Sequence, residues 1–368
     1  MLNIVSVLYL IVFLAIMLIL FVTSMLNFSF SRDIEKLFLT MLSIAFVALS
    51  ICVFYIEPPY EWDLYRHYEI LDNMRIGGMN YYLNLSTYKD LYVINFIYYL
   101  ISLTKHNGLL PFFALLFEGI IFLIIYYNEI HKNNKISFFF KMIIILLFFA
   151  LFNIVLAISG VRNNLAISIA GLALYLENKN KKNMYISLLL YIAAIFVHPI
   201  SSLVLVIRIM LLFKVEKLFF VFIFIAFSLD FILKILSTMN GAIFQYIYNL
   251  VNFYQGSYVE YSTIITVINL IYVIFLFIVL LKLYFVDKDR SLICKFSFIY
   301  VSMCLGLVFN LIFFYRAIMF TSFLSIFIIK KFILNAKKRK DISMLFVSGY
   351  SWLMMLLTVI QLASIIQW

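Results

Sequence analysis

Runs of apolar residues, each about as long as a helix that crosses a bilayer, follow one another along almost the whole chain. A spanning helix needs about 20 such residues to cross about 30 Å of hydrocarbon. Inside hydrocarbon, only helices and closed barrels satisfy all backbone polar groups. The chain is 66% hydrophobic and only 12% charged, which is about half the charged fraction of a soluble protein. These features predict an all-α polytopic integral membrane protein.

The apolar runs predict about 12 transmembrane helices and one short helix that does not span. The short helix is the run at 91–103, whose 13 residues would rise only about 20 Å. We therefore predict a re-entrant or surface helix there. The runs predicted to span are 4–30, 37–56, 109–127, 138–158, 162–177, 184–198, 199–213, 218–236, 263–284, 292–314, 316–330 and 343–366.

The segment Glu57–Asp90 is the main polar insertion in this apolar chain. It holds six of the seventeen acidic residues, and charged groups of this kind are costly in hydrocarbon. We predict a loop that faces water or lines a polar cavity. With only 10 glycines and 4 prolines in the chain, no stretch has the composition of a linker. Residues 1–368 are therefore predicted to form a single transmembrane domain.

The positive net charge, +11 at pH 7, sits largely in short loops between apolar runs, such as 132–135, 179–182 and 337–340. This distribution is typical of cytoplasmic membrane loops and argues against a nucleic-acid-binding groove. With 91–103 not spanning, one side of the predicted topology receives 21 Lys and Arg residues and the other receives 7. The first side is predicted to be cytoplasmic, which places Glu57–Asp90 on the extracytoplasmic side.

The sequence shows no group of residues suited to binding a metal or a cofactor. Cys52, Cys294 and Cys304 stand alone in apolar sequence and are expected to be packing residues. No His, Asp and Glu residues have the spacing of metal ligands, so we expect neither a metal nor a cofactor.

Three polar breaks interrupt the later apolar runs, at Ser159–Asn164, His198–Pro199 and Tyr315–Arg316. All three fall on the predicted outer side, where the two arginines in them are exceptions to the positive-inside tendency. Charged residues at membrane depth are functional candidates. The residues expected to share one outward-facing pocket are Arg162, Arg316, Asp63, Arg66 and His67.

Four short motifs occur in a fixed order: Asp63–Tyr68, Gly160–Ala166 (GVRNNLA), Phe196–Ser201 (FVHPIS) and Tyr315–Arg316. Together they resemble the EpsG branch of the Wzy-type polysaccharide polymerases, over about residues 40 to 330. The GVRNN element, followed about 35 residues later by an apolar helix that ends in F-x-H, is the most specific part. In this chain an Asn follows the Arg where such proteins often have Gln, and a Pro follows the His where a small residue is commoner.

The resemblance implies a multi-spanning, GT-C-like glycosyltransferase in the bacterial cytoplasmic (inner) membrane. Such enzymes transfer a growing glycan from a polyprenyl diphosphate, such as undecaprenyl diphosphate, to the non-reducing end of a new lipid-linked repeat unit. The reaction takes place on the outer face, with inversion if a single displacement occurs, and the product is an O-antigen of lipopolysaccharide, a capsule or an exopolysaccharide. Implied partners are the lipid-linked donor and acceptor, the bilayer and a chain-length regulator. A catalytic carboxylate is implied in an early outer loop, where Asp63 stands.

The expected chemistry assigns roles to the polar residues. Breaking a sugar C1–phosphate bond develops negative charge on the diphosphate, and a guanidinium binds phosphate oxygens with two parallel hydrogen bonds. Arg162 and Arg316 are therefore predicted to bind the diphosphate. Asp63 or His198 could accept the proton of the attacking hydroxyl, and Asp63 is preferred. The residues expected to position the acceptor or to stack on sugars are Arg66, His67, Asn163, Trp62, Tyr65 and Tyr68.

Ordinary structural roles are open for the same residues. The two arginines could extend to lipid headgroups, and His198 could cap a helix end. Asp63 and Arg66 could form a solvated pair worth under about 1 kcal/mol. Glu118, in the middle of an apolar run, is expected to face the interior of the helix bundle, and the sequence assigns it no chemistry.

Other classes of function fit the same features. A flippase or transporter for lipid-linked oligosaccharides would also need a basic, aromatic cavity, but transporters tend to show paired repeats and helices broken near the midplane. No repeat is visible here, and the polar residues cluster at the outer face, which favours the enzyme. A membrane acyltransferase would be expected to use a His-centred site, whereas two outer arginines favour a diphosphate. An O-antigen ligase shares the diphosphate chemistry and stays open as an alternative.

Overall fold

Besides a few single positions between 213 and 263, the computed structural model describes residues 2–26, 32–60, 62–85, 90–152, 154–213 and 263–339. Within these ranges every regular element is a helix. The predicted span at 343–366, and nearly all of that at 218–236, lie outside the described residues. The chain divides into two compact units, one made of Met1–Leu205 with Ser322–Trp368 and the other of Val206–Thr321. The single transmembrane domain stays a prediction.

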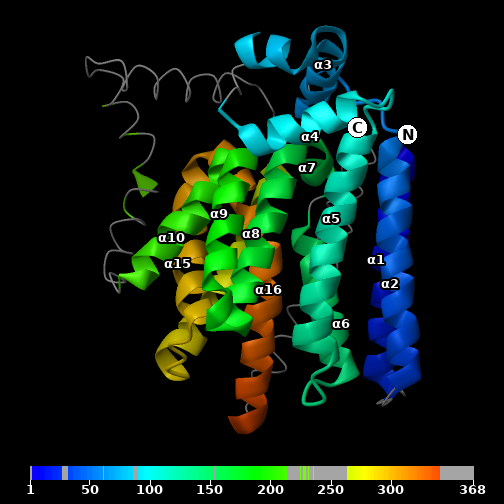
Figure 1. The fold of residues 1–368 in the computed structure, drawn as a ribbon. Helices are drawn as coiled ribbons and strands as arrows, with labels where there is room; N and C mark the ends of the chain where they lie inside the picture. The colour runs from blue at the N-terminus through cyan, green and yellow to red at the C-terminus, as the bar shows by residue number, and fades with distance from the viewer. Residues whose placement is uncertain are drawn as a thin grey trace. The chain divides into compact units, whose positions relative to one another are not determined.

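The first unit contains α1 to α9 and the later part of α16, and the second contains α14, α15 and the earlier part of α16 (Figure 1). The helix α10 begins in the first unit and continues into the second. The helices are α1 (Leu2–Leu26), α2 (Arg32–Phe54), α3 (Asp63–Leu85), α4 (Tyr92–Ser102), α5 (Leu109–Tyr126), α6 (Phe138–Leu151), α7 (Ile154–Ser159), α8 (Val161–Lys179), α9 (Met184–Val197), α10 (Ser202–Leu212), α14 (Thr263–Leu281), α15 (Leu292–Gly306) and α16 (Leu311–Arg339).

Several helices are suited to crossing a bilayer. Among the described residues, five are long and apolar enough to do so. Other apolar helices, such as α6 and α9, have 14 residues each, which corresponds to a rise of about 21 Å. The all-helical fold is thus confirmed for the described part of the chain, and the total of about 12 spans stays a prediction. The five candidate spans are Asp33–Phe54, Leu109–His131, Ile265–Val286, Leu292–Phe309 and Phe313–Ala336.

The run at 91–103 forms only the short helix α4, which has 11 residues and lies across the end of α9 in Figure 1. A rise of about 16 Å is too short to cross hydrocarbon. The close approach of Gly108 to Phe54 supports this topology, since a Cβ on Gly108 would lie 1.9 Å from the Phe54 carbonyl oxygen. The end of α2 and the start of α5 therefore meet, and the chain between them returns to where it left.

The polar insertion Glu57–Asp90 is not irregular, because the 23-residue helix α3 occupies most of its length; its extracytoplasmic position stays a prediction. The side chains of Leu64, His67, Leu71 and Met74 are all buried. Their spacing of three and four residues makes one buried face of a helix, while the charged residues occupy the other faces. The segment is highly charged because the outer side of this helix is polar. Within α3 a single glycine breaks the helical geometry, with φ +67° at residue 78.

Two helix boundaries differ from the prediction. The run at 138–158 divides at Phe152, which has an extended backbone. The expected break at Tyr315–Arg316 is wrong, since the helix is interrupted at Asn310 instead, and both residues lie inside α16. The Phe313 amide donates to Asn310 Oδ1 at 3.4 Å. Asn caps the orphan amides of a helix start, whereas Tyr and Arg are compatible with its interior.

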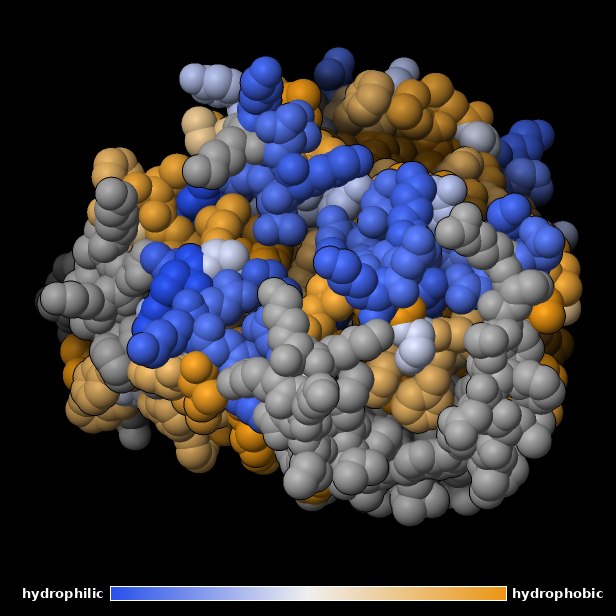
Figure 2. Space-filling model, turned by 90° about the horizontal axis from the view of Figure 1, so that it is seen from below, coloured by the Kyte–Doolittle hydropathy of each residue, from blue (hydrophilic) through white to orange (hydrophobic). Residues whose placement is uncertain are grey.

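One end of the first unit gathers paired charges. Lys141 Nζ lies 2.7 Å from Glu35 Oε2 and 3.0 Å from the His131 carbonyl oxygen, to which it donates. Lys330 pairs with Glu129. Figure 2 looks onto the face that is lowest in Figure 1, where the turn between α5 and α6 lies, and shows patches of hydrophilic residues between hydrophobic ones. Within the first unit, α2, α6, α16 and the turn after α5 are thus joined by charged pairs at this end.

The helix α8 lies in the interior of the first unit and packs on α5 and α9. Its Gly171 faces Phe323 of α16 so closely that a Cβ would lie 3.1 Å from that ring. Because α8 is enclosed by other helices, its polar side chains face protein rather than lipid. Five polar residues of α8 are buried: Arg162, Asn163, Asn164, Ser168 and Glu177.

Candidate active site

The first residue of α3 and the second residue of α8 meet. Asp63 Oδ2 lies 4.0 Å from Arg162 Nη2. Each helix begins at this place, and a helix start carries free amide groups and a partial positive charge that favour anions. Two helix starts and one buried guanidinium therefore converge on Asp63.

Two more side chains of α3 approach the Asp63 carboxylate. Arg66 Nη1 lies 3.9 Å away and His67 Nε2 lies 3.6 Å away, as expected for positions three and four residues further along a helix. These distances exceed normal hydrogen-bond lengths, so the attraction is chiefly electrostatic. The Asp63 side chain is 29% exposed, whereas those of His67 and Arg162 are 1% and 4% exposed. A substrate can therefore reach Asp63 directly, while His67 and Arg162 lie behind it.

His67 is held between α3 and α4. Its Nδ1 lies 3.0 Å from the Tyr98 hydroxyl, and Tyr98 is also buried. Burial lowers the pKa of His67 below its usual value, and the positive charges of Arg162 and Arg66 act in the same direction, while Asp63 opposes them. The imidazole is therefore uncharged at neutral pH. No feature of the apolar run at 91–103 distinguished Tyr98 from its neighbours.

Aromatic side chains surround the start of α3. Trp62 and Tyr65 are partly exposed, and the Tyr65 ring packs on that of Tyr60 with 5.1 Å between centroids. Tyr68 donates its hydroxyl to the Ile56 carbonyl at 3.4 Å, and burial raises its pKa, so it stays a neutral phenol. Trp62 and Tyr65 thus offer surfaces for stacking, while the hydroxyl of Tyr68 faces the backbone.

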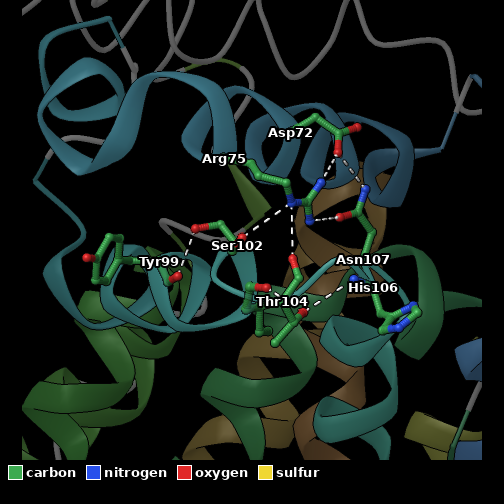
Figure 3. A network of polar contacts seen from close by, with 8 residues as sticks. Asp72, Arg75, Tyr99, Ser102, Thr104, His106 and Asn107 are labelled. Carbon is green, nitrogen blue, oxygen red and sulfur yellow. Dashed lines mark hydrogen bonds and ion pairs between the residues drawn. The ribbon is translucent and has the colours of Figure 1, made fainter.

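A hydrogen-bond network fixes α3 against the turn between α4 and α5 (Figure 3). Arg75 Nε donates to the carbonyl oxygens of Ser102 at 3.3 Å and Thr104 at 3.1 Å. Its Nη2 donates to Asn107 Oδ1 at 2.8 Å, and its Nη1 pairs with Asp72 at 2.5 Å. Asn107 Nδ2 also donates to Asp72 at 3.1 Å. We call these five residues the Arg75 clamp, and it sets how α3 lies on α4.

His198 caps the short 3-10 helix that begins at Pro199. Its Nδ1 accepts the Ile200 amide proton at 3.2 Å, and its carbonyl oxygen accepts from the Ser201 hydroxyl at 2.8 Å. A neutral imidazole has only one acceptor nitrogen. Since the backbone occupies that nitrogen, this geometry favours Asp63 over His198 as a base.

Arg316 and Asn163 are the remaining predicted site residues. Arg316 lies near the start of α16, in the second unit, and is partly exposed. Its neighbour Tyr315 is buried, with its hydroxyl 2.7 Å from that of Thr266. Asn163 is buried next to Arg162. A joint role of Arg162 and Arg316 at a diphosphate stays a prediction.

Glu118 of α5 and Asn164 of α8 form a second polar group in the first unit. Both are buried, and their side chains interact. Among the described residues, Glu118 Oε2 and both polar atoms of the Asn164 side chain have no hydrogen-bond partner of normal geometry. The GVRNN motif thus faces two ways, with Arg162 toward Asp63 and Asn164 toward α5.

Comparison with known proteins extends over all of these residues. Residues 59–367 match the EpsG family, a range that begins just before α3 and includes Asp63, Arg162, His198 and Arg316. No curated protein and no solved structure matches the chain. The chain belongs to the EpsG family, a family of Wzy-type polysaccharide polymerase-like proteins.

Proposed function

We propose that this protein polymerises lipid-linked repeat units of a surface glycan. It transfers the growing glycan from a polyprenyl diphosphate to the non-reducing hydroxyl of a new lipid-linked unit, on the extracytoplasmic face of the bacterial cytoplasmic membrane. The observation that carries the proposal is the convergence of two helix starts on the partly exposed carboxylate of Asp63, with Arg162 behind it. A site with one accessible base and a concentration of positive charge suits a reaction that releases a diphosphate.

The reaction proceeds by a single displacement at the anomeric carbon. The acceptor hydroxyl attacks C1 of the donor sugar while Asp63 takes its proton. The new C1–O bond forms as the C1–O bond to the diphosphate breaks, with inversion at C1. The electron pair leaves with the polyprenyl diphosphate, whose developing charge is stabilised by Arg162 and Arg316. Asp63 then releases the proton to water, which restores the site.

The ion pair between Asp63 and Arg162 gives the site a way to respond to its donor. At 4.0 Å the pair is loose, and a diphosphate offers Arg162 a stronger, bidentate partner. When Arg162 turns to the diphosphate, the Asp63 carboxylate loses this ion-pair partner. Donor binding thus prepares Asp63 to accept the proton.

Sugar binding falls to the exposed residues around Asp63. Trp62 and Tyr65 stack on sugar rings, while Arg66, which is 45% exposed, donates to hydroxyl groups of the acceptor. Tyr68 and Asn163 support this surface from behind, since the first bonds the backbone at Ile56 and the second is buried.

The test is glycan elongation by purified protein supplied with a polyprenyl-diphosphate-linked repeat unit. Wild type should convert the substrate into a ladder of longer lipid-linked chains. Asp63→Asn and Arg162→Ala should fold normally but lose activity by about a hundredfold or more, by analogy with the loss of an oxyanion-hole donor. Arg162→Lys should retain an intermediate activity, because it keeps the charge without the planar fork.

Matched controls separate catalysis from general damage. Asp33→Asn alters an exposed carboxylate that pairs with Lys36, and Arg290→Ala alters an arginine that packs on Tyr284. Both should elongate glycans like wild type. If wild type moves substrate between leaflets without lengthening it, the protein is a flippase, and transfer only to a different final acceptor would identify a ligase.

A further inference from the structure

The imidazole of His67 lies between a hydroxyl and a carboxylate. Its Nδ1 is 3.0 Å from the Tyr98 hydroxyl, and its Nε2 is 3.6 Å from Asp63 Oδ2. Neither His67 nor Tyr98 is exposed to solvent, so water does not compete for these contacts. The three side chains form a line from α4 through α3 to the exposed oxygen atoms of Asp63.

Only one tautomer of a neutral imidazole suits this line. A carboxylate accepts hydrogen bonds and donates none, so the nitrogen that faces Asp63, Nε2, carries the proton. Nδ1 then holds a lone pair and accepts from the Tyr98 hydroxyl. The opposite tautomer would place the Nε2 lone pair against a negative oxygen, which is electrostatically unfavourable in a buried site.

We propose that Tyr98 is a positioning residue of the active site: its hydroxyl donates to Nδ1 of His67 and so holds the imidazole with its Nε2–H directed at Asp63. The inference rests on the proposed function in so far as Asp63 is the base. Tyr98 acts through His67 and has no contact with substrate in this assignment.

The arrangement supplies Asp63 with a donor but not with another full charge. The charged groups that face His67 and Asp63 are Arg66 from α3 itself and Arg162 from α8. From α4 the facing titratable group is Tyr98, and the sequence of α7, IVLAIS, has none. A third positive charge at His67 would lower the basicity of Asp63 further. Keeping His67 neutral therefore favours proton transfer to Asp63.

Loss of the Tyr98 hydroxyl has a defined consequence. A donor on Nδ1 stabilises the neutral imidazole, because protonation would remove the lone pair that accepts it. In Tyr98→Phe this stabilisation is absent, and Nδ1 becomes free to take a proton. The pKa of His67 should rise, and the tautomer with Nδ1–H should become populated.

Nitrogen NMR of the full chain labelled with ¹⁵N-histidine reads the tautomer directly. The chain has 4 histidines, so His67→Gln identifies the signals of this one. At neutral pH wild type should show an unprotonated Nδ1 and a protonated Nε2. Tyr98→Phe should shift signal toward Nδ1–H or imidazolium and raise the titration midpoint. The matched control is Tyr99→Phe, which removes a hydroxyl from the next residue of α4 and should behave like wild type.

Glycan elongation across a pH series tests whether the positioning matters for the reaction. In Tyr98→Phe the acidic limb of kcat should move to higher pH, with kcat reduced about tenfold, by analogy with the hydrogen-bond partners of metal-ligating histidines. Tyr99→Phe should leave both unchanged. A wild-type Nδ1 that carries the proton, or a Tyr98→Phe variant with an unchanged tautomer and midpoint, overturns the proposal.

The two measurements fail separately. If wild type makes no glycan, the proposed function is wrong, while the nitrogen signals still decide whether Tyr98 orients His67. If the tautomer changes in Tyr98→Phe but the acidic limb of kcat stays in place, the contact is structural, and Tyr98 has no positioning role in the reaction.

Discussion

Lys141 of α6 and Glu35 of α2 form a partly buried ion pair with 2.7 Å between Nζ and Oε2. The pair lies at the opposite end of the first unit from Asp63, and Lys141 makes a further hydrogen bond to the backbone of residue 131. Removing one partner of such a pair is costly. The contact therefore holds α2 and α6 in register at this end of the first unit.

Lys141→Met should lower the free energy of unfolding by about 1–3 kcal/mol, because the partly buried carboxylate of Glu35 loses its charged hydrogen-bond donor. Adding Glu35→Gln should restore most of the loss. Thermal unfolding in detergent, run as a double-mutant cycle, measures the coupling. As a control, Lys36→Met removes an exposed cation whose pair with Asp33 is solvated, and it should change stability little. Equal costs for the two lysines would contradict the assignment.

Gly108→Ala should destabilise the protein by about 1–3 kcal/mol, as overpacking does. The added Cβ would meet the Phe54 carbonyl, and a backbone atom at the end of a helix cannot move aside as a flexible side chain can. The melting temperature in detergent provides the measurement. Gly77→Ala, at an exposed position of α3, should be neutral or slightly stabilising. An unchanged melting temperature for Gly108→Ala would show that α2 and α5 do not meet there.

Arg75→Lys should loosen the Arg75 clamp even though it keeps the positive charge. A lysine cannot reproduce a planar fork that donates to two carbonyls, an amide and a carboxylate at once. We expect a loss of about 1–2 kcal/mol in the free energy of unfolding, together with a lower kcat for glycan elongation. Lys105→Ala, in the same turn but exposed, is the control and should affect neither. A normal kcat in Arg75→Lys would show that the Arg75 clamp does not affect the active site.

The stability of wild type should fall as the pH decreases below about 6.5, the usual pKa of histidine. His67 has a lowered pKa in the folded protein, so the unfolded chain binds its proton first and gains stability relative to the folded state. The loss continues until the pH reaches the native pKa. The melting temperature between pH 7.5 and about 5 should therefore decrease more steeply in wild type than in His67→Gln. Parallel curves would contradict the buried, neutral state of His67.

Glu118→Gln should preserve the fold, since an amide of the same shape can still interact with Asn164. Glu118→Ala should cost about 1–3 kcal/mol, because it leaves the polar atoms of Asn164 buried next to an empty space. Urea or thermal unfolding in detergent compares the two variants. Glu177→Ala removes another buried carboxylate from the unit, and it serves to show the cost of such a change 13 residues further along α8 from Asn164. If Glu118→Ala were as stable as Glu118→Gln, the interaction between Glu118 and Asn164 would not contribute to stability.

The sequence was most informative where a physical requirement left little freedom. The run at 91–103 was too short to span, and the structure has an 11-residue helix there. That single assignment placed the segment around Asp63 and the start of α8 at the same end, and the structure brings Asp63 and Arg162 to 4.0 Å. Chain length and hydrocarbon thickness were enough for this inference.

Tertiary contacts explain what sequence reasoning missed. Tyr98 is one of many aromatic residues in apolar runs, and only the fold brings it to His67. Arg75 looked like one more charge in a polar segment, yet all of its hydrogen-bond partners except Asp72 lie 27 to 32 residues away in the chain. The spacing of Leu64, His67, Leu71 and Met74 is that of a helix with one buried face. Two of these four buried positions hold His and Met rather than the large aliphatic residues that make such a pattern clearest.

Because Phe54 and Gly108 are in contact, the segment between them leaves the helix bundle and returns to it at the same place. Its two ends enter the bundle at a single point, so residues can be inserted, deleted or exchanged within it without shifting the register of any spanning helix. Under the proposed function, the aromatic residues around Asp63 can vary with the sugar, while Asp63 itself and Arg162 of α8 are retained. Under this function, exchange of those aromatic residues between relatives would change which glycan is accepted.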